Sequence, residues 1–179
     1  QTYFGQDKGW PAVRNFIQYK LFGSGPIVSN GPATQAFLRI GGVPESEDLN
    51  IQLYSVGMLF PSPFVKRPAP GVTLLANLVR PHSRGSLSLA SADPRDELRF
   101  VSNYLGDERD LRVLVESIGL MREILRTDPL REKILQEVVP GPQCVSPADL
   151  AAYVKQSVET DYHPSGTCKM GRDDDPMAV

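Results

Sequence analysis

The chain has 179 residues and a formal net charge of −2, and its basic residues are scattered along the sequence. This balance gives no electrostatic basis for binding nucleic acid or an anionic membrane surface, so we expect neither partner. Hydrophobic residues make up 41% of the chain and charged residues 22%, which is typical of one globular domain. The longest apolar run, residues 51–60, contains Gln52 and is too short for a transmembrane segment.

The first third of the chain predicts a helix followed by strands. Apolar spacing predicts a helix over residues 9–25, where Pro11 suits the first turn and glycines end the pattern. Short runs bounded by Gly, Pro, Ser and Asp predict strands over residues 34–40, 49–56, 73–80, 86–91 and 98–104. Because the connections carry no helical pattern, the strands are expected to pair in antiparallel fashion.

Helical patterns return in the second half. They cover residues 107–129, 128–142 and 146–159, and Ser146 is expected to cap the last of these helices. A block of strands followed by a block of helices predicts an α+β fold, in which an antiparallel sheet of about five to six strands has helices packed on one face.

The run DYHPSGTCKMG, residues 161–171, contains His163, which is one of only two histidines in the chain. Pro164 disfavours helical backbone at His163, and Gly166 permits a tight turn, so the motif predicts a stiff loop that presents an imidazole. Histidine titrates near neutral pH and can transfer a proton there. Spacing alone fits both a catalytic histidine and a structural loop histidine.

The residues around this histidine resemble a known family. The string YHPSGTCKMG is similar to the C-terminal signature of glucose–methanol–choline (GMC) oxidoreductases. Residues 83–125 and 22–31 also resemble segments of that family, in the same order and with approximately the same spacing. Within the family, the chain looks most like the choline-dehydrogenase branch.

The resemblance implies that residues 1–179 are the substrate-binding domain of an FAD-dependent enzyme, truncated before the C-terminal segment that contacts FAD. Such enzymes oxidise a small alcohol by hydride transfer to the flavin, while a histidine matching His163 handles the hydroxyl proton. The implied partners are this alcohol and the FAD-binding domain of the same chain, and the implied location is the cytoplasm, or the membrane periphery.

The resemblance also sets limits on this chain. The Gly-x-Gly-x-x-Gly string that binds dinucleotides is not found in the sequence, and the family's second catalytic residue is expected beyond residue 179. We therefore expect the isolated chain to bind little FAD and to be inactive. Two alternatives stay open, namely a lyase of the same fold that holds FAD structurally and a free-standing α+β binding module.

Residues of the strand region are expected to form the substrate pocket together with the histidine loop. The candidates are aromatic or apolar, and they are Tyr54, Met58, Phe60, Phe64 and Tyr162. The acidic run at residues 173–175 lacks the spacing of a calcium loop, so we expect a solvated loop and no metal site.

Overall fold

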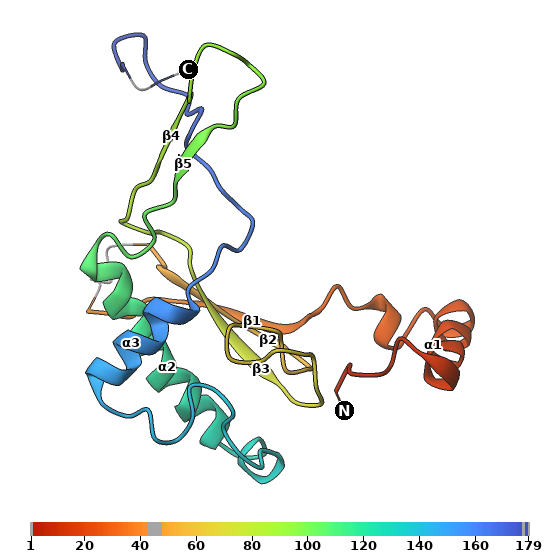
Figure 1. Cartoon of the computed structure of the whole chain (residues 1–179). Coiled ribbons are helices and arrows are strands. Elements are labelled where there is room, and N and C mark those ends of the chain that lie inside the picture. Colours follow the sequence, from red (N-terminus) through yellow and green to blue (C-terminus); the bar gives the residue numbers. More distant parts are fainter. Residues whose placement is uncertain (1, 43–47, 177, 179) are drawn as a thin grey trace.

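A three-stranded antiparallel sheet is the centre of the computed structural model, which describes residues 2–42, 48–176 and 178 (Figure 1). Its strands, in spatial order, are β1 (Pro32–Leu38), β2 (Ile51–Val56) and β3 (Thr73–Leu78). A helical layer covers one face of this sheet, while an N-terminal helix and a hairpin project away from it in different directions. The helices are α1 (Gly9–Phe22), α2 (Glu108–Arg126) and α3 (Pro147–Ser157), with short 3-10 turns at Pro26–Val28 and Arg131–Lys133.

The core lies between β2 and α2. Side chains alternate between the two faces of a strand, so Ile51 and Leu53 point to the same face of the sheet. They are 0% and 5% exposed, and they cluster with Val113 of α2. Each such buried side chain contributes about 1.5–3 kcal/mol to folding. This packing commits one face of the sheet to α2 and leaves the other face for other contacts.

The three main helices confirm the sequence prediction in type and approximate bounds. Asp107 caps α2 by accepting a hydrogen bond from the backbone N–H of Arg109. Ser146 caps α3 in the same way, because its Oγ accepts from the N–H of Asp149 at 3.1 Å. Gly23 ends α1 in left-handed backbone, with a φ of 58° that suits glycine.

The prediction of a helix over residues 128–142 is wrong. Beyond Pro129, which has no N–H to continue the helix α2, the chain forms only the 3-10 turn Arg131–Lys133 and then a loop. Arg122 of α2 holds this loop, because its guanidinium pairs with Glu137 at 2.8 Å and donates to the carbonyl of Cys144 at 2.9 Å. The helical spacing of the segment is not matched by burial, since Leu130, Leu135 and Val138 are all exposed.

The α+β class and the antiparallel pairing are confirmed, but the described strands do not form one sheet. Strands β4 (Ser86–Ser88) and β5 (Arg99–Val101) pair with each other in a separate hairpin. The hairpin begins at Gly85, where a Cβ atom would clash with the carbonyl of Val101 and lie 2.8 Å from that of Ser102. The hairpin extends away from the three-stranded sheet in Figure 1.

A buried carboxylate fixes the base of this hairpin. Asp110, in the first turn of α2, is 1% exposed and accepts hydrogen bonds from the backbone N–H groups of His82 and Ser83, each at 2.8 Å. The hydroxyl of Ser83 also donates to Asp110 and accepts from the N–H of Asp107 at 3.1 Å. These contacts lock the chain between β3 and β4 onto the start of α2.

No helix within residues 2–42 and 48–176 is both long and apolar enough to cross a bilayer.

Replacing Asp110 with asparagine tests the lock at α2. Asp110→Asn keeps the volume but turns an NH2 group toward donors that need an acceptor, so we expect the free energy of unfolding to fall by about 2 kcal/mol. Urea unfolding followed by circular dichroism measures the change. Glu108→Gln, on the exposed side of the same turn, is the control, and an equal loss in both variants would contradict the assignment.

Candidate functional site

The loop that carries His163 leaves the end of α3 and turns sharply before the histidine. Tyr162 has a φ of 59°, which is uncommon for a residue other than glycine, and its N–H donates to Oγ1 of Thr160 at 3.0 Å. Gly166 provides a second turn with a φ of 88°. His163 stands between these two turns, and its side chain is 85% exposed. The local sequence therefore presents the imidazole away from the loop backbone, as predicted.

A hydrogen bond joins this loop to the sheet. The side-chain amide of Asn77, on β3, donates to Oδ2 of Asp161 at 2.7 Å, across a sequence separation of 84 residues. The same oxygen lies 3.9 Å from Nε2 of His163. This separation is too long for a hydrogen bond but short enough for a solvent-screened electrostatic contact when the imidazole is protonated. One carboxylate therefore bridges the sheet and the histidine.

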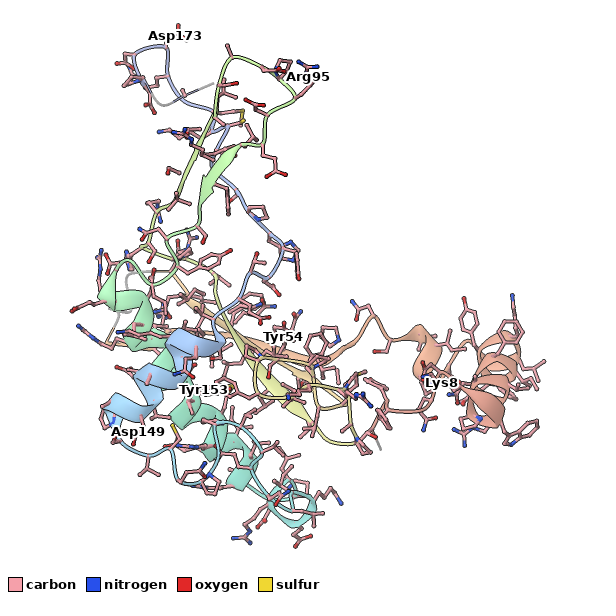
Figure 2. The ribbon with its side chains drawn as sticks, viewed as in Figure 1. Lys8, Tyr54, Arg95, Asp149, Tyr153 and Asp173 are labelled. Carbon is pink, nitrogen blue, oxygen red and sulfur yellow. The ribbon has the colours of Figure 1, made fainter. Side chains whose placement is uncertain are left out.

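Asn77 lies on the face of the sheet opposite the core. It faces Gln52 of β2 in the register, and the amide of Gln52 donates to that of Gln35 on β1 at 3.0 Å. Tyr54 shares this face, two residues along β2, and is labelled on the sheet in Figure 2. A row of polar side chains thus crosses the sheet where the histidine loop meets it.

The environment of Tyr54 supports this arrangement. Its phenol has a pKa above the ordinary value, firstly because the group is partly buried and secondly because the charge of Asp161 opposes ionisation. A hydrogen bond with Asn77 acts in the opposite direction. The pKa of Tyr54 therefore depends on the same carboxylate that lies beside His163.

The other predicted pocket residues lie in different parts of the fold. Oγ1 of Thr73 donates to the carbonyl of Met58 at 2.8 Å and accepts from the N–H of Phe60 at 2.9 Å, so both residues are fixed at the end of β2. Phe64 packs instead against Tyr153 of α3, with ring centroids 5.1 Å apart. The side chain of Tyr162 is exposed. Their roles as pocket residues stay predictions.

Sequence reasoning missed Asp161 and Asn77. Asn77 is the one amide in the otherwise apolar or small run TLLANL, and a polar residue in such a strand is a signal that a specific partner faces it. Asp161 stands two residues before His163, close enough to act on it if the loop turns back. Only the fold shows that these two residues meet.

The arrangement is suited to proton transfer. An exposed imidazole can accept a proton from a bound hydroxyl, and a carboxylate 3.9 Å away stabilises the imidazolium that results. Across residues 2–42, 48–176 and 178, no three His, Cys, Asp or Glu side chains are grouped so that they could hold a metal ion. The imidazole of His163 and the carboxylate of Asp161 can support acid–base chemistry.

Comparison with known proteins gives a family match and individual relatives. Residues 81–179 match a family model described as GMC oxidoreductase. The chain is 31% identical over 176 residues to an oxygen-dependent choline dehydrogenase of Chromohalobacter salexigens, covering 95% of this chain and 31% of that protein. It is 37% identical over 103 residues to an alcohol dehydrogenase [acceptor] of Pseudomonas putida, covering 58% of this chain and 19% of that protein.

The fold agrees with these matches. A formate oxidase of Aspergillus oryzae, studied for its FAD modification, superposes with a TM-score of 0.73 at 23% identity. The superposition covers 93% of this chain and 34% of that one, so the arrangement of helices and strands is shared. The chain spans only about a third of the length of the choline dehydrogenase and the formate oxidase that it matches.

Titration of the tyrosines tests whether Asp161 lies beside Tyr54. Because the negative charge of Asp161 opposes formation of the phenolate, Asp161→Asn should lower the pKa of Tyr54, which stays above its ordinary value because burial remains. Ultraviolet absorbance of the phenolate against pH measures this shift, and Tyr54→Phe identifies the band. An unchanged titration in Asp161→Asn would show that the two groups are not neighbours.

Proposed function

The chain belongs to the GMC oxidoreductase family, and from this premise we propose that residues 1–179 form the substrate-binding part of an FAD-dependent oxidoreductase that oxidises an alcohol. The family match over residues 81–179 supports the proposal, because it includes the histidine loop. The names of the relatives support the substrate class, since they include a choline dehydrogenase and an alcohol dehydrogenase. Both names describe oxidation of a CH–OH group, so an alcohol is the substrate class proposed.

The observation that carries this proposal is the exposed imidazole of His163, held beside the polar face of the sheet. In the proposed reaction His163 accepts the hydroxyl proton of the alcohol as hydride leaves the neighbouring carbon. Removing the proton leaves an alkoxide-like oxygen, which makes departure of the hydride easier. A general base placed in this way typically contributes about 10²–10⁴ to the rate.

The described residues fit one side of a flavin site. The imidazole is open to solvent, and the polar face formed by Gln52, Tyr54 and Asn77 can line a substrate cavity. When bound, FAD supplies the acceptor for the hydride. We propose that polypeptide outside this chain holds most of the cofactor, and that the chain alone binds FAD weakly and is inactive.

Exposed apolar side chains support the proposal that another domain packs against this chain. Trp10 of α1 and Phe100 of the hairpin are exposed, and so are several apolar neighbours of each. Exposed apolar surface on this scale is typical of an interface that another domain covers. We propose that the FAD-binding part of the same protein covers it. A cytoplasmic location is also proposed, in line with Cys144 and Cys168, which are both free thiols.

Replacement of His163 in the full-length enzyme tests the proposal. His163→Ala should lower kcat by about 10²–10⁴, because the base is lost, while the FAD content of the purified protein is retained. The rate at which an alcohol bleaches the yellow flavin under anaerobic conditions measures the chemical step.

The second histidine provides a matched control. His82 contacts Asp110 through its backbone N–H, so His82→Ala keeps that hydrogen bond and should leave turnover unchanged. Equal losses of FAD and of turnover in His163→Ala would make His163 a structural residue and would contradict the proposed role.

A further inference from the structure

Asp161 is a carboxylate to which the proposed reaction assigns no role. Among the described residues, its partners are the amide of Asn77 at 2.7 Å, the phenol of Tyr54 through a side-chain hydrogen bond, and the imidazole of His163 at 3.9 Å, and no lysine or arginine pairs with it. Its charge is therefore not neutralised by a permanent cation. The protonated imidazole of His163 is the group that can pair with this charge.

Asn77 gives this carboxylate a fixed place. The residue lies in β3, whose backbone pairs with β2 over its whole length, so the amide is held by a rigid element. Asp161 itself lies on an exposed loop, where a carboxylate without a partner would sample many positions. The hydrogen bond from Asn77 removes much of that freedom and keeps Oδ2 near Nε2 of His163.

We infer that Asp161 is a positioning residue for His163, and that Asn77 in turn holds Asp161 for this purpose. The inference rests on the proposed function. When the imidazole takes the proton of the substrate hydroxyl, it becomes a cation, and the carboxylate of Asp161 stabilises that cation. The O–H bond of the alcohol breaks, an N–H bond of the imidazole forms, and the bonding electrons stay on the alcohol oxygen.

Two other residues on the sheet bear on this contact. Tyr54 of β2 faces the same carboxylate, and the pKa of its phenol is raised, so the phenol stays neutral where the enzyme works and adds no competing charge. Gln52 lies opposite Asn77 and is also neutral. Asn77 and Tyr54 therefore contact Asp161 as neutral groups, and the protonated imidazole is the cation beside it.

The test uses the full-length enzyme with FAD bound. Asp161→Asn keeps the shape of the side chain but removes the charge, and it should lower kcat by about 3- to 30-fold, less than the loss of the base itself, with KM and FAD content little changed. Asn77→Ala should give a smaller loss. Because both residues act through one contact, the double variant should lose no more than Asp161→Asn alone.

A measurement independent of turnover is the NMR signal of the His163 imidazole in histidine-labelled protein, identified by its disappearance in His163→Ala. At a fixed pH, Asp161→Asn should move this signal. Asp128→Asn is the control, since it also removes an exposed carboxylate from an ion pair, with Arg131, and should leave both the signal and kcat unchanged.

The possible outcomes separate the inference from the proposed function. If His163→Ala retains full turnover, the proposed function fails. If His163→Ala is impaired while Asp161→Asn keeps both its kcat and its imidazole signal, the inference alone fails. Loss of FAD and of turnover together in Asp161→Asn would also overturn the inference, because it would assign Asp161 to folding. Recovery of most of kcat in Asp161→Glu would support the charge as the cause.

Discussion

The hydrogen bond between Asn77 and Asp161 connects two parts of the chain that are 84 residues apart, and the candidate site depends on it. Together with the hydrogen bond between Tyr54 and Asp161, this contact holds the loop after α3 against the sheet and so sets where His163 lies. With it, an imidazole, a carboxylate and a polar strand face are brought together. Side chains of two paired strands therefore tie the histidine loop to the sheet.

This arrangement requires that the two faces of the sheet differ. Ile51 and Leu53 bury one face against α2, and that packing supplies the stability of the central layer. The alternating residues of the same strand, Gln52 and Tyr54, face the other way and stay available for polar contacts. The hydrogen bonds that Asp110 accepts from His82 and Ser83 then hold the start of α2 against the segment that follows β3.

Local signals in the sequence predicted the helices, the strands and the loop of His163. They failed where distant parts of the chain decide the outcome. Residues 128–142 have helical spacing but are held as a loop by Arg122 and Glu137, and the last two strands form their own hairpin instead of joining the central sheet. Asp161 was missed for the same reason, because only the fold brings Asn77 to it.

We propose that His163 acts on a substrate bound over the polar face of the sheet. An experimental structure of the full-length enzyme with FAD and a bound alcohol analogue would show whether it does. We expect the hydroxyl oxygen within hydrogen-bond distance of the His163 imidazole, with Asp161 on the far side of the ring and still bound to Asn77. An analogue bound elsewhere, or an imidazole turned away from it, would show that His163 does not act on the substrate.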